Sequence, residues 1–334
     1  MYIFLTGGKT MGHITPLISL YYNLKDKYEI IYFGLENSME EEVCKRLNIR
    51  FYPLDLLPFY RKNFFKNICS FLKISKSITK IKKDHKNAPI KAIISSGGFV
   101  SFPLVFAFKN NRKVKKLLIE PNSVIGLANK LLIKHVDYVC TQFLISNDSK
   151  FIQTGNPIEI TNPSFDHPSF YLNKNMILFL GGSNGALEIV KLANDFNTFY
   201  PDIEIFVITG EKYYDTYKFN SNAHVYKKLN NISSIFKFFK IIVSRSGAST
   251  ITEIILTNSA SILLPSKFVT ANHQYKNALF LEKKNACILL SKYEKDSYLE
   301  VFKLYTNIDQ ITLMKTNLVS LKEENSVNNI IKLL

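Results

Sequence analysis

Two short stretches of the chain share one pattern: an apolar run, a pair of glycines and the start of a helix. The first is YIFLTGGKTMGH, at Tyr2–His13, and the second is ILFLGGSNGA, at Ile177–Ala186. The apolar runs are typical of buried strands, and the glycines can adopt positive φ and let another group approach the backbone. The helix that follows each loop offers unpaired N–H groups and its positive dipole end to an anion. Two such loops predict two nucleotide-binding domains that face a shared cleft.

The length and the other apolar runs also indicate two α/β domains. At 334 residues, the chain suits two domains of about 150 residues better than one core. Apolar runs alternate with helical patterns, which is typical of parallel sheets with crossover helices. We expect strands at Tyr2–Thr6, Glu29–Phe33, Ala92–Ser95, Lys116–Ile119, Tyr138–Thr141, Ile177–Leu180, Ile203–Thr209, His224–Tyr226, Ile241–Ser244 and Ser261–Leu264.

A proline-rich segment separates the two sets of strands. In TGNPIEITNPSFDHPSFYLNKN, at 154–175, three prolines prevent a regular element and indicate a linker or hinge. We therefore predict one domain at 1–157 and a second at 158–316. The final segment, 317–334, has helical spacing and predicts a helix that packs on either domain.

The composition excludes some classes of protein. The longest apolar runs, such as Phe102–Phe108, are far shorter than the ~20 residues of a membrane span. The chain opens directly on a strand pattern, so we expect no secretion signal. The four cysteines form no CxxC pair and have no histidine at metal-ligand spacing. This predicts reduced, buried thiols in a cytosolic protein and no metal site.

The chain has a net charge of +16, and part of it is a background of lysines along the whole sequence. One segment exceeds this background: in Phe59–Lys86, nine basic residues and one acid are interleaved with apolar residues at helical spacing. One interpretation is an ordinary surface helix whose apolar stripe faces the core. The other is a patch that docks on an anionic membrane surface through aromatics and lysines. Nucleic acid is a less suitable partner, because no recognised nucleic-acid motif accompanies the segment. The predicted membrane patch comprises Phe64, Phe65, Phe71 and Lys73.

Two stretches of the second half carry polar residues that suit a nucleotide sugar. In IIVSRSGASTITE, a predicted strand ends at Ser244 and Glu253 lies in the helix that follows. A carboxylate there can accept hydrogen bonds from the hydroxyls of a ribose, or it can merely complement the helix dipole. In LPSKFVTANHQYKNALFLE, His273, Gln274 and Asn277 lie near a helix start. The two amides suit a polyhydroxyl ligand, and solvated helix caps are the alternative.

Seven strings, in order along nearly the whole chain, resemble glycosyltransferase family 28. In the first half they are GGKTMGHITP at Gly7–Pro16, SGGFVSFP at Ser96–Pro103, IEPNSVIGLANKLL at Ile119–Leu132 and TGNPI at Thr154–Ile158. In the second half they are GGSNGA at Gly181–Ala186, SRSGASTITE at Ser244–Glu253 and HQYKNA at His273–Ala278. Each string alone is only moderately specific, but their common order makes the resemblance strong.

The resemblance implies a GT-B fold, in which two doubly wound, Rossmann-like domains face a cleft. It assigns the acceptor and the membrane to 1–157 and the UDP-sugar donor to 158–316, and it implies that 317–334 crosses back to the first domain. On the donor side it assigns the diphosphate to Ser183, the uracil to the backbone near Leu229, the ribose to Glu253, and the sugar hydroxyls to Gln274 and Asn277. On the acceptor side it implies Thr10, Gly12, His13, Glu120 and Asn122.

The implied activity is the inverting transfer of N-acetylglucosamine from UDP-N-acetylglucosamine to the muramyl 4-hydroxyl of undecaprenyl-pyrophosphoryl-MurNAc-pentapeptide, a step of peptidoglycan synthesis. The resemblance also implies a peripheral enzyme at the cytoplasmic face of the cell membrane. No DxD pair is present to hold a metal, so we expect glycine-loop amides and helix N-termini to stabilise the leaving diphosphate without a cofactor. His13 is the candidate base, because an ordinary histidine pKa of about 6.5 allows proton uptake near neutral pH. Phosphate binding or orientation of the loop is the alternative role for His13.

Other functions stay open. Glu159 follows TGNPI where the family usually has arginine, and a carboxylate there would repel a diphosphate. A different GT-B enzyme, such as a UDP-sugar:diacylglycerol glycosyltransferase or a UDP-N-acetylglucosamine 2-epimerase, would share the fold and the donor site. Epimerases need no basic and aromatic membrane patch. A non-enzymatic basic protein that binds membrane or nucleic acid through charge would leave the ordered glycine motifs unexplained.

Overall fold

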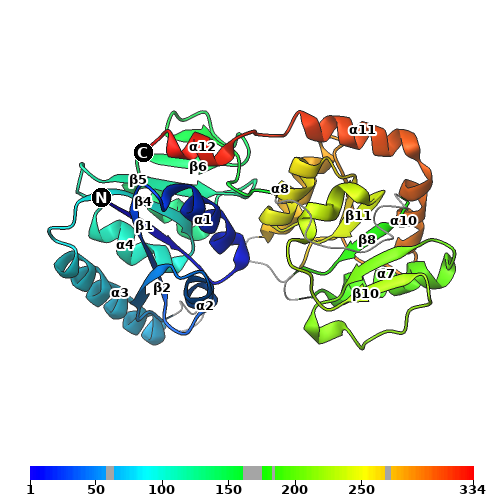
Figure 1. The fold of residues 1–334 in the computed structure, drawn as a ribbon, viewed down its shortest axis with the longest axis horizontal. Coiled ribbons are helices and arrows are strands. Elements are labelled where there is room, and N and C mark those ends of the chain that lie inside the picture. The colour runs from blue at the N-terminus through cyan, green and yellow to red at the C-terminus, as the bar shows by residue number, and fades with distance from the viewer. Residues whose placement is uncertain (58–63, 161–174, 183–184, 268–271) are drawn as a thin grey trace. The chain divides into compact units, whose positions relative to one another are not determined.

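The computed structural model describes residues 1–57, 64–160, 175–182, 185–267 and 272–334, and for residues 64–66 it describes the helix but not the side chains. Contacts between residues divide the chain into two units (Figure 1). Unit 1 comprises Met1–Ile158 and Glu323–Leu334, and unit 2 comprises Glu159–Lys322. The first change of unit thus falls one residue after the predicted boundary at 157.

Unit 1 is built on a parallel sheet with the strand order β3-β2-β1-β4-β5-β6-β7. Its strands are β1 (Tyr2–Gly7), β2 (Glu29–Leu35), β3 (Arg50–Leu54), β4 (Ile90–Gly97), β5 (Lys115–Glu120), β6 (Tyr138–Thr141) and β7 (Phe151–Gln153). Its helices are α1 (Met11–Leu24), α2 (Met39–Arg46), α3 (Phe64–Asp84), η1 (Phe99–Ser101), α4 (Phe102–Ala107), α5 (Leu127–Leu132), η2 (Ile133–His135) and α12 (Ser326–Ile331). The strand order reverses between β1 and β4, the place where doubly wound folds bind their ligands.

The side chains of β1 alternate between two cores, as the period of a strand requires. Ile3 and Leu5 pack in a cluster with residues of α1, α2 and α12. Phe4 packs in a second cluster with residues of α3, α4 and α5. Helices therefore cover both faces of the sheet, which explains why its central strands are continuous apolar runs rather than alternating ones.

The end of the chain returns to unit 1, but not as the single helix predicted at 317–334. Residues 317–319 instead complete α11, which belongs to unit 2, and the chain then turns before α12. Helix α12 lies beside α1 (Figure 1), and its Val327 and Ile330 are buried in the cluster that contains Leu17. Helical spacing predicted the two helical ends of this segment and missed the break between them.

Unit 2 repeats the doubly wound order on a six-stranded parallel sheet, β10-β9-β8-β11-β12-β13. Its strands are β8 (Ile177–Leu180), β9 (Ile205–Ile208), β10 (Ala223–Tyr226), β11 (Ile241–Ser244), β12 (Ser261–Leu263) and β13 (Ile288–Leu289). Its helices are α7 (Leu187–Phe199), η3 (Glu211–Tyr213), η4 (Ile232–Phe238), α8 (Ala248–Thr257), α9 (His273–Glu282), α10 (Ser297–Thr306) and α11 (Ile308–Val319). Here the strand order reverses between β8 and β11.

Only part of the predicted linker, 154–175, can serve as a connection between the two units. Thr154, Asn156 and Ile158 are buried in unit 1, where Asn156 N donates to Gln142 Oε1 at 2.6 Å and its carbonyl accepts from Ser326 Oγ at 3.0 Å. This start of the segment therefore belongs to the core and fixes α12. Pro163 and Pro168 lie outside the described residues.

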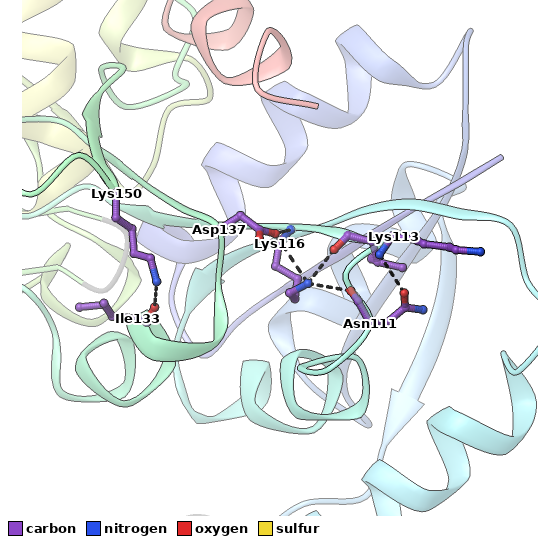
Figure 2. Close-up of polar contacts among 7 residues, drawn as sticks. Asn111, Lys113, Lys116, Ile133, Asp137 and Lys150 are labelled. Atoms are coloured by element: carbon purple, nitrogen blue, oxygen red, sulfur yellow. Dashed lines mark hydrogen bonds and ion pairs between the residues drawn. The ribbon is translucent and has the colours of Figure 1, made fainter.

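Part of the positive charge is structural. Lys116, on β5, is buried, and its Nζ donates to the carbonyl oxygens of Asn111 and Val114 at 3.0 and 2.7 Å (Figure 2). Its backbone N–H donates to Asp137 Oδ2 at 2.7 Å, and Lys150 Nζ donates to the carbonyl of Ile133 at 2.9 Å. These lysines satisfy carbonyl groups inside unit 1, so they need no external partner.

Candidate active site

The first glycine loop leaves β1 at the point where the strand order of unit 1 reverses. A Cβ on Gly7 would overlap the hydroxyl of Ser96, which lies on the neighbouring strand β4. A Cβ on Gly8 would overlap the carboxylate of Glu40. Tyr32 donates its hydroxyl to the carbonyl of Gly7 at 2.6 Å. Close approach by neighbouring side chains therefore requires glycine at both positions.

His13 lies in the first turn of α1 and is tied to β4 in two ways. Its Nδ1 is 2.7 Å from the carbonyl oxygen of Ser96, and Ser96 Oγ donates to the carbonyl of His13 at 2.6 Å. Because a carbonyl only accepts, Nδ1 carries a proton, and in the neutral ring Nε2 is the nitrogen that can accept one. Thr10 precedes the helix without capping it through its side chain, and Gly12 lies in the first turn.

Glu120 shapes the loop that follows β5. The carboxylate is buried and accepts four hydrogen bonds, from Asn122 N and Nδ2, Gly126 N and Asn129 Nδ2, at 2.8–3.1 Å. Both carboxylate oxygens of Glu120 thus accept hydrogen bonds from groups of the protein itself. Glu120 and Asn122 therefore hold the Pro121–Gly126 loop, and a direct contact of either with an acceptor stays a prediction.

The second glycine loop leaves β8 at the corresponding point of unit 2. Gly181 N donates to the carbonyl of Ile208 at 2.9 Å, and Gly185 N donates to that of Gly182 at 3.1 Å. Gly182 and Gly185 have φ of +78° and +71°, and a Cβ on Gly182 would meet no atom of the described residues within 4 Å. Ser183, predicted to contact a diphosphate, lies outside the described residues.

Arg245 anchors the carboxyl edge of this sheet. Its Nη1 donates to the carbonyls of Leu264 and Pro265 at 2.9 and 3.1 Å, and its Nη2 lies 2.6 Å from Glu188 Oε2 in the first turn of α7. One planar guanidinium therefore connects the ends of β11 and β12 to the helix that follows the glycine loop.

Glu253 is half-buried in the second turn of α8. Burial raises the pKa of its carboxyl to about 7, and a hydrogen bond with Ser233 in η4 opposes that rise. The helix-dipole explanation does not hold, because the dipole acts mainly within the first turn, where α8 has no acidic residue. Leu229, predicted to lie near the uracil, is in the segment between β10 and η4, just ahead of Ser233.

Gln274 and Asn277 bind the turn between β11 and α8. Gln274 Oε1 accepts from Ser266 N at 2.9 Å, its carbonyl accepts from Ser246 Oγ at 2.8 Å, and buried Asn277 donates to the carbonyl of Ser246 at 3.3 Å. They are therefore not merely solvated caps, and the residue before α9 is Asn272. Contacts between these amides and sugar hydroxyls stay a prediction.

Within the described part of the basic segment, Phe64–Asp84 form one helix, α3, with two different halves. Ile74, Ile78 and Ile81 pack on the core, as an ordinary surface helix requires. Towards the other end, Phe71 and Leu72 are 62% and 58% exposed. Lys73 is paired with Asp55 at 2.5 Å, so its charge is partly neutralised. The side chains of Phe64 and Phe65 lie outside the described residues.

Two functional candidates escaped the sequence reasoning. Glu40 lies in the run MEEEVCKR, which has the composition of a solvated helix, although its side chain is fully buried. Arg245 was inside a recognised motif, and it is the sole arginine after Arg112 in the sequence. That isolation in a lysine-rich chain was a usable signal, whereas nothing local distinguished Glu40.

The described residues contain no group of three or more His, Cys, Asp or Glu side chains arranged to hold a metal ion. Among the helices described, none is both long and apolar enough to cross a membrane.

Two doubly wound domains, each with a glycine loop at its switch point, define the GT-B class of α/β proteins. The N-terminal domain of glycosyltransferase family 28 matches residues 3–141, and the C-terminal domain of that family matches residues 176–334. A UDP-N-acetylglucosamine–N-acetylmuramyl-(pentapeptide) pyrophosphoryl-undecaprenol N-acetylglucosamine transferase of Bacillus licheniformis is 31% identical over 96% of this chain and 93% of its own. The chain belongs to glycosyltransferase family 28.

Solved structures share the fold. MurG of Acinetobacter baumannii superposes with a TM-score of 0.75 at 20% identity, covering 99% of this chain and 98% of its own. A UDP-N-acetylglucosamine 2-epimerase superposes with a TM-score of 0.66 at 12% identity, covering 99% and 94%. The predicted GT-B fold is therefore confirmed, and the fold alone does not separate transferase from epimerase.

Proposed function

We propose that the protein transfers N-acetylglucosamine from UDP-N-acetylglucosamine to the muramyl 4-hydroxyl of undecaprenyl-pyrophosphoryl-MurNAc-pentapeptide. The observation that carries this proposal is the match to a relative of that name over 96% of the chain. A match of this extent includes both halves, so a donor domain and an acceptor domain are both present. The glycine loops of both halves support it, because each lies at a switch point.

The donor is assigned to unit 2. Glu253, beside Ser233 in η4, offers a carboxylate to the ribose hydroxyls, and the backbone near Leu229, which precedes η4 in the chain, is assigned to the uracil. The Gly181–Ala186 loop, to which Ser183 belongs in the sequence, and the start of α7 are assigned to the diphosphate. Gln274 and Asn277 set the Ser244–Gly247 turn next to the sugar.

The acceptor and the proton transfer are assigned to unit 1. His13 takes the proton of the attacking 4-hydroxyl on Nε2, while Ser96 fixes the ring through Nδ1. The hydroxyl attacks the anomeric carbon and UDP leaves from the opposite face, which inverts the configuration to β. Backbone N–H groups stabilise the developing charge on the diphosphate, so the reaction needs neither a metal nor a cofactor.

The enzyme works as a peripheral protein on the cytoplasmic face of the cell membrane, not on nucleic acid. The exposed part of α3 supports this, since Ile68, Phe71 and Leu72 are 42–62% exposed beside Lys76 and Lys80. Aromatic and aliphatic side chains enter the headgroup region, and lysines attract anionic lipid. This surface brings unit 1 to the lipid-linked acceptor.

The test is an assay of transfer with purified protein. UDP-N-acetylglucosamine is supplied with the lipid-linked muramyl-pentapeptide, with diacylglycerol, or with no acceptor. We expect β-linked disaccharide in the first reaction only. Glycosylated diacylglycerol would identify a glycolipid synthase instead, and UDP-N-acetylmannosamine without an acceptor would identify an epimerase.

A further inference from the structure

Glu40 is a buried carboxylate behind the first glycine loop. It lies in the first turn of α2 with 0% of its surface exposed, and its Oε2 and Oε1 accept from the backbone N–H of Lys9 and Leu35, each at 3.2 Å. It therefore joins the loops that follow β1 and β2 at the carboxyl edge of the sheet. The reaction proposed above does not use it.

The surroundings of Glu40 are built to admit it. A Cβ on Gly8 would overlap its carboxylate, and a Cβ on Gly34 would lie 2.6 Å from its Cγ. Burial raises the pKa of the neighbouring Cys44 thiol to about 12, and the negative charge of Glu40 adds to this rise. Two glycines and a neutral thiol thus make a fitted slot for one carboxylate.

Lys9 has a backbone conformation that lysine seldom adopts. Its φ is +76°, and every other non-glycine residue with positive φ in the described ranges is an asparagine. Asparagine tolerates the left-handed region, whereas the side chain of lysine gives it no such support. In this conformation Lys9 N donates to Glu40 Oε2 at 3.2 Å.

The same hydrogen bond orients the whole peptide between Gly8 and Lys9. In a trans peptide the N–H and the carbonyl point in opposite directions, so the Gly8 carbonyl is turned away from Glu40. It lies on the side of Gly98, where it would be 3.6 Å from a Cβ on that glycine. Gly98 lies two residues after Ser96, the residue that holds His13.

We propose that Glu40 is a positioning residue of the acceptor site: it holds Lys9 in the left-handed conformation and so fixes which face of the Gly8–Lys9 peptide meets the acceptor. This inference rests on the proposed function, in which the loop borders the acceptor. Glu40 acts through the loop and touches neither substrate.

The test is a double-mutant cycle read in steady-state kinetics. In Glu40→Gln, one carboxylate oxygen becomes an amide nitrogen that cannot accept, and we expect the KM for the lipid-linked acceptor to rise about tenfold, the scale of one lost charge-assisted hydrogen bond. The KM for UDP-N-acetylglucosamine should not change. In Lys9→Gly, the left-handed conformation at position 9 no longer needs the hydrogen bond from Glu40, because glycine takes positive φ freely. Glu40→Gln should therefore have little effect in a chain that carries Lys9→Gly, and its full effect in one that carries Lys9→Ala.

Asp137→Asn is the control, since Asp137 also accepts a backbone N–H, that of Lys116 (Figure 2). Asp137 precedes β6, so it lies at the amino end of the strands and away from the carboxyl edge that holds Glu40. Asp137→Asn should leave the acceptor KM unchanged. An equal effect of Glu40→Gln with Lys9 and with Lys9→Gly, or an equal rise in both KM values, would overturn the proposal. Glu40→Asp, which keeps the charge but shortens the reach, serves if the glutamine variant does not fold.

Hydrogen exchange separates this inference from the proposed function. Wild-type protein that transfers no sugar refutes the function and leaves the loop to be tested on its own. Exchange at the Lys9 amide should then be faster in Glu40→Gln than in wild type and unchanged in Asp137→Asn. Equal protection in wild type and Glu40→Gln would show that Glu40 does not hold the loop.

Discussion

The two glycine loops occupy equivalent places in the two sheets but are anchored by side chains of opposite charge. In unit 1 the anchor is Glu40, which accepts the N–H of Lys9 in the loop itself. In unit 2 it is Arg245, which donates to carbonyls at the ends of β11 and β12 and pairs with Glu188 on α7. The first loop is therefore held through its own backbone, whereas Arg245 holds the strand ends and the helix beside the second loop.

This difference indicates how one fold supports two tasks. A carboxylate behind the first loop consumes an N–H group and adds negative charge, so that loop alone is a poor phosphate site. Beside the second loop, no described residue would contact a Cβ on Gly182, and the charge of Arg245 is balanced by Glu188 rather than added to by a buried acid, so the start of α7 can meet a diphosphate. The comparison therefore favours unit 2 for the nucleotide and leaves unit 1 to hold the acceptor and the base.

The largest effect is expected at His13. His13→Asn keeps a donor near the carbonyl of Ser96 but removes the group that accepts a proton, so kcat should fall by about 10²- to 10⁴-fold. The KM for UDP-N-acetylglucosamine should stay constant. Steady-state and single-turnover rates would measure this. A kcat within a few-fold of wild type would reduce His13 to a loop-orienting residue.

The next effect concerns the anchor of unit 2. Arg245→Ala removes the ionic partner of Glu188 and the guanidinium donor of two carbonyls. We expect it to lower the free energy of unfolding by about 2 to 3 kcal/mol, less than for a fully buried pair because Glu188 is partly exposed. Calorimetry would detect the lower Tm, and titration would detect weaker binding of UDP-N-acetylglucosamine. Glu188→Gln is the control, since it removes only the ionic partner. Wild-type affinity in Arg245→Ala would refute the role of this anchor at the donor site.

The sequence predicted the central strands well and the edges poorly. Strands β6, β8 and β11 match their predicted bounds, because buried parallel strands are unbroken apolar runs. The prediction missed the edge strands β3, β7 and β13, and it found the fourth edge strand, β10, at His224–Tyr226. Edge strands are short and partly exposed, and β3 contains Pro53, so their composition resembles that of a loop.

Predictions of the site were limited for a different reason. Motifs located the loops, and the resemblance named His13, Glu120 and Glu253, because these lie near glycine turns along the chain. Burial and the choice of partner depend on distant residues. Glu40 is buried only because Gly8 and Gly34 leave room for it, and no periodicity in MEEEVCKR indicates this.

Glu253 sharpens the comparison through pH. Its pKa of about 7 lies above the usual 4.5, so folding favours its protonated form, and its contribution to stability is lost as pH rises from about 4.5 to 7. The free energy of unfolding of Glu253→Gln, relative to that of wild type, should therefore be higher at pH 8 than at pH 5. Thermal unfolding at the two pH values would measure this change. Equal differences at both values would mean that the carboxyl does not titrate in that range.

The same carboxyl predicts the pH dependence of donor binding. The ionised form accepts both ribose hydroxyls, so Glu253→Ala should weaken binding by about 1 to 3 kcal/mol at pH 8 and by less at pH 6. UDP-N-acetylglucosamine is the suitable probe for calorimetric titration, because its diphosphate is a diester that is already fully ionised and has no proton to lose near neutral pH. Unchanged affinity would remove Glu253 from the donor site.

The smallest effect tests whether the membrane surface belongs to unit 1 alone. Phe71 on α3 and Phe199 at the end of α7 are 62% and 58% exposed, so they form a matched pair in the two units. Phe71→Ser should weaken binding to anionic vesicles by about 1 to 2 kcal/mol, the value of one aromatic side chain withdrawn from the headgroup region. Phe199→Ser should leave it unchanged, and added salt should weaken binding of both variants and of wild type, because ions screen the lysines. Vesicle sedimentation over a salt series gives these affinities, and turnover of a short-chain, water-soluble acceptor should be unaffected by Phe71→Ser. Equal losses for the two phenylalanine variants would mean that the exposed end of α3 is not the docking surface.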